Sequence, residues 1–210
     1  MLKKNKTLVI LVSIVTLLPI LVGILLWNQL PEQMPTHWNA AGEIDDWSSK
    51  AFAVFGLPCI MLAGLWAWIF ASYADPKREA HSNKVYQLVL WIIPALSVVL
   101  HTIMYATALG KEVRVEMIMP VFMGLLFAII GNYMPKCKQN YTIGIKIPWT
   151  LNNEENWNKT HRFAGWLWTA CGLVIMLTGI FGGFWIFFAI VLLMVLASVI
   201  YSYMLHRRGF

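Results

Sequence analysis

Charged residues are scarce in this sequence. Asp, Glu, Lys and Arg make up 12% of its 210 residues, whereas 59% of the residues are hydrophobic. A soluble domain usually contains about 25% charged residues, because water must hydrate its surface. The shortage of charge therefore excludes a soluble domain and predicts a protein that lies in a lipid bilayer.

Cysteine is also rare, and common catalytic motifs are missing. The three cysteines have no CxxC spacing, which argues against a zinc site or a disulfide framework. The sequence contains no HExxH, no GxSxG and no phosphate-binding glycine loop. We therefore expect no catalytic residues, no cofactor and no bound metal. A membrane-bound enzyme that uses His161, Glu154 and Glu155 is kept as a minor alternative.

Long apolar runs dominate the chain. Each run falls within the range of about 17–25 residues that an α-helix needs to cross a bilayer. We expect an all-α integral membrane protein with six transmembrane helices, in one membrane domain with three parts: 1–73, 74–134 and 135–210. Gly182 and Gly183 are expected to form a tight turn between the last two helices. The predicted crossings are residues 7–27, 51–73, 85–109, 117–134, 163–181 and 184–205.

The distribution of Lys and Arg predicts the orientation. Thirteen of the sixteen lie in the N-terminal tail, the 74–84 loop, the 135–162 loop and the C-terminal end. Cytoplasmic loops are enriched in these residues, so we expect both termini in the cytoplasm. The net charge of +6 is spread over several loops. We therefore expect contact with membrane lipid and no direct binding of nucleic acid.

The loop from Asn28 to Lys50 is predicted to be an acidic external cap. It contains four acidic residues and a single lysine. One interpretation is a cap that merely joins two helices. A weaker alternative is a cation site formed by His37, Asp45 and Asp46, since imidazole and carboxylate are suitable ligands. The candidate residues of this loop are His37, Trp38, Asn39, Gly42, Asp45 and Trp47.

His101 is the only His, Asp, Glu, Lys or Arg inside the six predicted crossings. Burial of an ionisable group in a membrane is costly, so such a group is a functional candidate. The alternative is a neutral histidine that bonds to a neighbouring helix. Because no buried acid or base can pair with His101, ion-coupled transport is disfavoured.

The 135–162 loop is more polar than the rest of the chain. Pro148 favours an extended backbone at Ile147, and Asn152 with Glu155 has the form of a helix N-cap. These signals predict a short helix over 153–160. Its Lys159 and the following Arg162 are placed to contact anionic headgroups or to pair with Glu154 and Glu155. By these patterns alone the loop is an interfacial helix with a basic end.

The same loop contains a pattern that runs from Gly144 and Lys146 through Pro148, Trp149 and Thr150 to Trp157, His161 and Arg162. This pattern closely resembles the signature of the SdpI family of bacterial immunity proteins. The first loop, with Pro31, Pro35 and Lys50, also resembles the N-terminal domain that accompanies this signature. Lys146 departs from the arginine that we expect at that position, which keeps the charge but loses bidentate bonding. The signature residues are Gly144, Lys146, Pro148, Trp149, Thr150, Glu154, Glu155, Trp157, Lys159, His161 and Arg162.

The resemblance implies a Gram-positive plasma-membrane protein that protects its host from a secreted, membrane-active peptide toxin. It also implies a receptor role, in which a cytoplasmic autorepressor of transcription is held at the membrane. We expect the toxin to contact either the external loop or the helices, where Gly64, Gly124 and Gly179 would admit a close helix. The alternative function is a small transporter or exporter of a hydrophobic peptide or drug.

Overall fold

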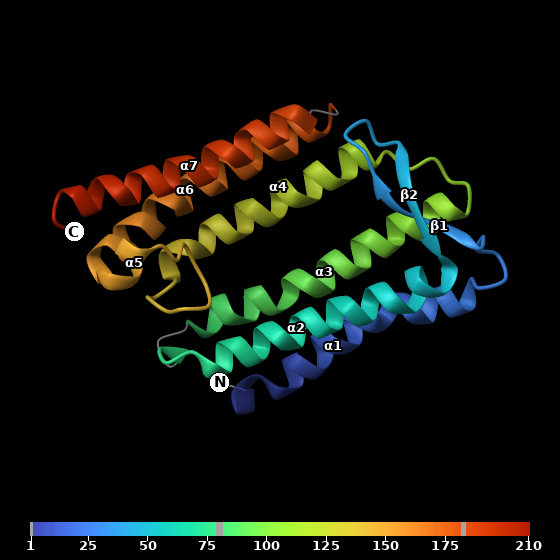
Figure 1. Cartoon of the computed structure of the whole chain (residues 1–210), viewed down its shortest axis with the longest axis horizontal. Coiled ribbons are helices and arrows are strands. Elements are labelled where there is room, and N and C mark those ends of the chain that lie inside the picture. The colour runs from blue at the N-terminus through green and yellow to red at the C-terminus, as the bar shows by residue number, and fades with distance from the viewer. Residues whose placement is uncertain (1, 79–81, 182–183) are drawn as a thin grey trace. The chain divides into compact units, whose positions relative to one another are not determined.

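The computed structural model describes residues 2–78, 82–181 and 184–210. Within them, six helices are long and apolar enough to cross a membrane, which confirms the predicted number of crossings (Figure 1). The predicted turn at Gly182 and Gly183 lies outside the described residues. The six helices are α1 (Leu2–Leu25), α2 (Leu57–Ala74), α3 (Asn83–Ala108), α4 (Val115–Tyr133), α6 (Glu154–Gly179) and α7 (Phe184–Arg207).

The chain packs as two compact units. The first comprises Met1–Tyr73 with Gln87–Val115, and the second comprises Ala74–Tyr86 with Glu116–Phe210. The first unit therefore contains α1, α2 and most of α3. The second contains α4, α6, α7 and the short helices η3 (Met134–Lys136) and α5 (Pro148–Asn152).

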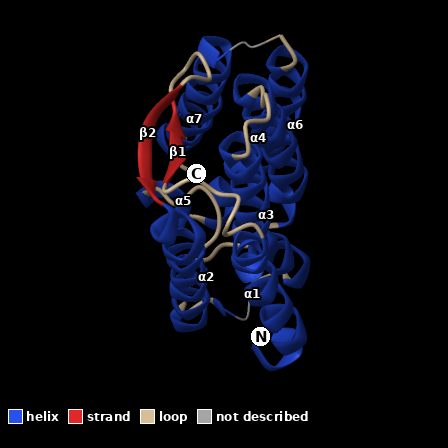
Figure 2. Cartoon of the chain, turned by 90° about the vertical axis from the view of Figure 1, so that its right-hand side faces the viewer, coloured by secondary structure: helices blue, strands red, loops and turns tan. Residues whose placement is uncertain are grey.

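A β-hairpin in the first unit departs from the all-α expectation. Strand β1 (Gln33–Trp38) pairs antiparallel with β2 (Ile44–Ser49), as Figure 2 shows. Both strands contain aromatic and β-branched residues, which favour extended structure. The turn between them needs Gly42, whose φ is +80°. Strands of six residues are too short to stand out beside membrane runs, so a search for apolar runs misses them.

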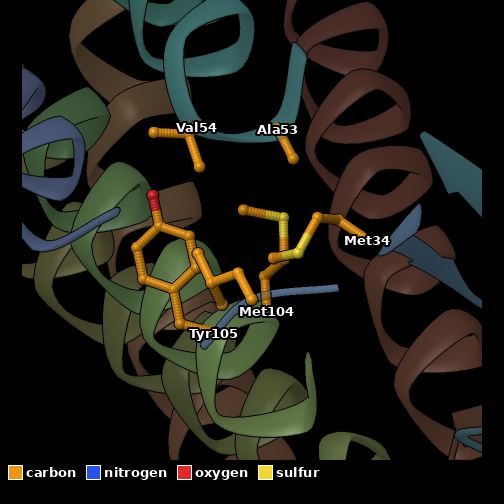
Figure 3. Close-up of a cluster of buried hydrophobic side chains, with 6 residues drawn as sticks. Met34, Ala53, Val54, Met104 and Tyr105 are labelled. Atoms are coloured by element: carbon orange, nitrogen blue, oxygen red, sulfur yellow. The ribbon is translucent and has the colours of Figure 1, made fainter. Parts of the chain in front are cut away.

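A buried cluster attaches the hairpin to the helices of the first unit. Met34 of β1 packs against Ala53 and Val54, which belong to the short π-helix η1 (Phe52–Gly56), and against Met104 and Tyr105 of α3 (Figure 3). Met34, Ala53 and Val54 have no exposed surface. Full burial of a Met or Val side chain stabilises a fold by about 1.5–3 kcal/mol. The hairpin is therefore part of the packed unit.

Hydrogen bonds to backbone carbonyls join α1 and α3. The Ser97 hydroxyl donates to the Thr16 carbonyl oxygen (2.8 Å), and the Tyr105 hydroxyl donates to the Pro19 carbonyl oxygen (3.0 Å). His101 Nδ1 donates to the carbonyl oxygen of Ser97 (2.7 Å), four residues back on its own helix. The expected bond from His101 to a neighbouring helix has support, because the Ala53 backbone of the π-helix η1 is a second hydrogen-bonding partner of the ring.

Glycines at intervals of seven bring α4 and α6 into backbone contact in the second unit. A Cβ at Gly124 would lie 2.7 Å from the Gly172 carbonyl oxygen, and one at Gly131 would lie 2.5 Å from the Thr169 nitrogen. Gly179 packs in the same way against Pro120. Gly124 and Gly179 therefore allow close helix packing within this unit. A Cβ added at Gly64, in contrast, would have no atom within 4 Å. Of the three glycines expected to admit another helix, only Gly64 is open.

Helix α6 is longer than the sequence predicts. The expected helix over 153–160 and the expected crossing over 163–181 form one continuous helix from Glu154 to Gly179. The N-cap is Asn153, not Asn152: its side chain accepts a hydrogen bond from the Asn156 N–H (2.9 Å). Polar residues in the first turns interrupt the hydrophobic run without interrupting the backbone hydrogen bonds.

Candidate functional site in the connection between α4 and α6

The connection between α4 and α6 contains five of the eleven signature residues, and the start of α6 contains the other six. It consists of η3, the loop of residues 137–147, which we call the signature loop, and α5. Ile147 is extended (φ −121°, ψ 158°) directly before Pro148, as predicted. The Thr150 hydroxyl accepts a hydrogen bond from the Ile147 N–H (3.1 Å) and contacts the Ile145 carbonyl oxygen at 2.8 Å. Pro148 and Thr150 therefore define the start of α5.

The buried side chain of Asn140 holds the backbone of the signature loop through hydrogen bonds. Its side-chain oxygen accepts hydrogen bonds from the N–H groups of Thr142 (2.8 Å) and Ile143 (2.7 Å). Its amide nitrogen donates to the carbonyl oxygens of Lys138 (2.7 Å) and Ile143 (2.9 Å). With 1% of its surface exposed, Asn140 replaces the backbone pairing that a regular element would supply.

Asp75 attaches the signature loop to the segment that follows α2. One carboxylate oxygen accepts from the Tyr141 N–H and the Thr142 hydroxyl, both at 2.9 Å. The other accepts from the Lys77 N–H at 2.8 Å. A buried carboxylate is tolerated when several donors surround it, and Asp75 is only 2% exposed. The sequence analysis missed this residue; its one local signal is an acidic residue before Pro76, at the end of an apolar run.

Trp157 and His161 of α6 form the floor beneath the signature loop. Their rings stack with centroids 4.0 Å apart, and the Trp157 indole N–H donates to the Cys137 carbonyl oxygen (2.7 Å). His161 Nδ1 donates to the Trp157 carbonyl oxygen (2.8 Å), and Nε2 accepts from the Ile145 N–H (2.9 Å). These partners define a neutral ring, because one nitrogen donates and the other accepts. His161 holds the loop and leaves neither nitrogen free.

Gly144 lies directly over this floor. Its φ is +121°, a conformation that residues with a side chain rarely adopt. A Cβ at this position would lie 2.4 Å from His161 Nε2 and 2.9 Å from the Trp157 ring. The glycine in the signature is therefore required by both backbone conformation and space.

A buried polar network links the start of α6 to the end of α7. The Ser202 and Thr160 hydroxyls contact the side-chain oxygen of Asn156 at 2.6 and 3.0 Å. The Asn156 amide donates to the Ser202 carbonyl oxygen (3.0 Å). The sequence analysis singled out none of these residues, because single polar residues in apolar helices show no spacing that predicts a partner 46 residues away.

The remaining signature residues lie outside this packed centre. Lys146 is exposed and donates to the Thr142 carbonyl oxygen (3.2 Å), and Lys159 pairs with Glu155 (3.0 Å) as predicted. Glu154 and Arg162 are exposed. Trp149 packs edge-on against Tyr203 and stacks on His206 of α7. Thr150, Trp157 and His161 of the signature are therefore buried and shape the loop. The charged residues of the signature lie at the surface, and we call them the charged set: Lys146, Glu154, Glu155, Lys159 and Arg162.

Cys137 is a buried thiol at the edge of the centre. The thiol contacts the Ile143 carbonyl oxygen at 3.3 Å, and it is 6% exposed. Burial raises the pKa of Cys137 from 9.0 to about 11. Since the thiolate is the reactive form, this thiol is unreactive at neutral pH while the loop stays closed.

The candidate residues of the first loop lie on the hairpin of the first unit. His37 Nδ1 contacts an Asp45 oxygen at 2.6 Å, and Asn39 caps the turn by accepting from the Ala41 and Glu43 N–H groups. Trp38 packs against the buried cluster, whereas Trp47 is 50% exposed. Asp46 accepts from the Trp47 N–H (2.8 Å) and does not join His37 and Asp45. Among the described residues no group of three or more possible metal ligands is present.

Comparison with known proteins gives matches at both candidate regions. A model of the SdpI/YfhL protein family matches residues 136–202, and one of a domain of unknown function (DUF1648) matches residues 14–62. The chain is 30% identical over 203 residues to the immunity protein SdpI of Bacillus subtilis (strain 168), across 94% of this chain and 92% of that protein. No solved structure matches the chain. Both predicted resemblances are confirmed.

Proposed function

The chain belongs to the SdpI/YfhL protein family, and on this basis we propose that it protects the bacterium that makes it from a secreted, membrane-active peptide toxin. It is a multi-pass protein of the bacterial plasma membrane. The observation that carries the proposal is the similarity to an immunity protein along nearly the whole chain, in the hairpin as well as the signature.

The proposed role is not enzymatic. The similar protein is named for immunity, and His161, the one histidine of the signature, uses both ring nitrogens to hold the loop. A general base needs a nitrogen within reach of a substrate proton. This arrangement supports a binding role over a catalytic one.

We propose the hairpin as the surface that meets the toxin. The acidic residues Glu32, Glu43, Asp45 and Asp46 are exposed, and Trp47 presents an aromatic ring beside them. A cationic, apolar peptide would be attracted by the carboxylates and would bury part of the indole ring. Because Met34 and Trp38 pack beneath the hairpin, the exposed residues can be changed without removing its support.

Survival of a sensitive Gram-positive host tests the function. Cells that produce the protein are expected to outlive cells with an empty vector when a membrane-active peptide toxin is added. Trp47→Ala with Asp46→Asn is expected to reduce the tolerated toxin concentration about tenfold, the effect of losing roughly 1.4 kcal/mol of binding. Equal survival of producing cells and empty-vector cells across a panel of such toxins would exclude immunity.

The matched control for this test is Trp166→Ala. Trp166 is 76% exposed on α6, so its replacement removes an exposed indole elsewhere in the chain. Membrane levels of all variants are measured in parallel. If Trp166→Ala lowers resistance as much as the hairpin variant does, the hairpin is not the recognition surface.

We also propose that the charged set of the signature binds a soluble repressor of transcription. Lys146 and Arg162 are exposed cations that leave the buried centre intact. The expected result is that toxin changes transcription in cells with the parent protein, and that Lys146→Ala with Arg162→Ala abolishes this response while survival is unchanged. Sequencing of RNA with and without toxin measures it. A parental response in the double variant would reject the receptor role.

A further inference from the structure

A narrow groove runs between α1 and α3 in the first unit. It has a volume of about 320 Å³. One wall runs from Leu18 of α1 to Leu26, just past the end of that helix, and the other runs from Val98 of α3 to Leu109, just past the end of α3. Lys111 lies at one end, and it is the only Lys, Arg, Asp or Glu in the lining. Neither the hairpin nor the signature loop contributes to this groove.

The polar side chains that line the groove bond to backbone groups of the surrounding helices. The Thr102 hydroxyl donates to the Val98 carbonyl oxygen (2.7 Å), and the Tyr105 hydroxyl donates to Pro19 (3.0 Å). His101 Nδ1 donates to Ser97 (2.7 Å). The rest of the lining between Leu18 and Leu109 is aliphatic or proline. Such a surface favours a hydrocarbon ligand over a hydrated one.

The dimensions of the groove match one leaflet of a bilayer. At about 1.5 Å per residue, its walls are about 12 Å long on α1 and about 16 Å long on α3. Half of a hydrocarbon core of roughly 30 Å is about 15 Å. The length and the apolar lining of the groove therefore match one extended acyl chain.

The positive charge of Lys111 at the end of the groove indicates which kind of lipid headgroup would bind there. Lys111 follows Gly110, whose φ of +75° ends α3 and turns the chain. A lysine just beyond the end of a membrane helix lies at the level of the lipid phosphates. We propose that the groove binds one acyl chain of an anionic phospholipid, with the Lys111 ammonium on its phosphate.

Lipid binding by the purified protein tests the proposal. The protein in mild detergent is titrated with phosphatidylglycerol or phosphatidylcholine, and bound lipid is counted by native mass spectrometry. We expect phosphatidylglycerol to bind more tightly, and Lys111→Gln to weaken it about fivefold, the effect of one lysine near a lipid surface. Ala106→Trp is expected to abolish binding, because Ala106 lines the groove.

Two controls and one competitor complete the design. Lys84→Gln removes an exposed lysine near the other end of α3, and Ala63→Trp adds an indole to an exposed position of α2. Both are expected to bind lipid as the parent does. Glycerophosphoglycerol, the headgroup without chains, is expected not to compete. Parental binding by Lys111→Gln or Ala106→Trp, or competition by the free headgroup, would overturn the proposal.

Discussion

Gly144→Ala is expected to lower the thermal unfolding midpoint by roughly 4–24 °C. The added methyl group meets His161 Nε2 at 2.4 Å, so the hydrogen bond from Ile145 to that nitrogen must break. An unfavourable backbone conformation costs about 1–3 kcal/mol, and a buried donor without a partner costs about 1–3 kcal/mol more. A loss of 1 kcal/mol lowers the midpoint by about 2–4 °C in a chain of this size.

Substitution of two other glycines distinguishes the cost of backbone strain from the cost of the contact with His161. Gly110 also has a positive φ, but no atom lies within 4 Å of the place a Cβ would take, so Gly110→Ala carries backbone strain alone. Gly64 is helical and equally open, so Gly64→Ala is expected to be neutral or to stabilise by up to about 1 kcal/mol. The expected order of destabilisation is Gly144, Gly110, Gly64. If Gly110→Ala destabilises as much as Gly144→Ala, contact with His161 contributes nothing.

Asp75→Asn is expected to cost about 2–4 kcal/mol and to open the signature loop. The donors of this carboxylate include the Lys77 N–H, the Tyr141 N–H and the Thr142 hydroxyl. An amide of the same shape places an NH₂ group against at least one of them, which leaves a buried donor unpaired. The loss is measured by thermal unfolding in detergent.

The reactivity of the Cys137 thiol gives a second, independent measure of whether the signature loop is open. In a Cys59→Ala, Cys171→Ala background, the buried thiol is expected to resist a maleimide reagent at pH 7 in the parent and to react in Asp75→Asn. The control is Asp46→Asn, an exposed acid of the hairpin that is expected to change stability by less than about 0.5 kcal/mol. If the Cys137 thiol stays unreactive in Asp75→Asn, the Asp75 carboxylate is not what holds the signature loop closed.

The membrane crossings were predictable because the bilayer imposes a length. A helix must satisfy all its backbone groups internally and span the hydrocarbon core, so each crossing appears as a long apolar run. The start of α6 was placed wrongly for the same reason: the polar side chains between Glu154 and Arg162 end the hydrophobic run but not the helix. The hairpin was missed because six-residue strands carry little signal.

The residues that hold the site were only partly predictable. The signature marked Gly144, Trp157 and His161, but as members of a pattern with no assigned contact. Asp75 lies 66 residues before its partner Tyr141, and Asn156 lies 46 residues before Ser202. A hydrogen bond between distant residues leaves no periodic trace in one sequence.

By itself, the sequence determined that the chain lies in a lipid bilayer, how many times it crosses and to which family it belongs. These features follow from the length of apolar runs and from short motifs, which are local properties of the sequence. The tertiary structure decided which signature residues are structural and which are available to a partner. Burial distinguishes them: His161 and Thr150 are enclosed by the backbone they support, whereas Lys146 and Arg162 face outward. Only folding brings Asp75, the signature loop and α6 together, because their contacts are long-range and become favourable when water is excluded from all three at once.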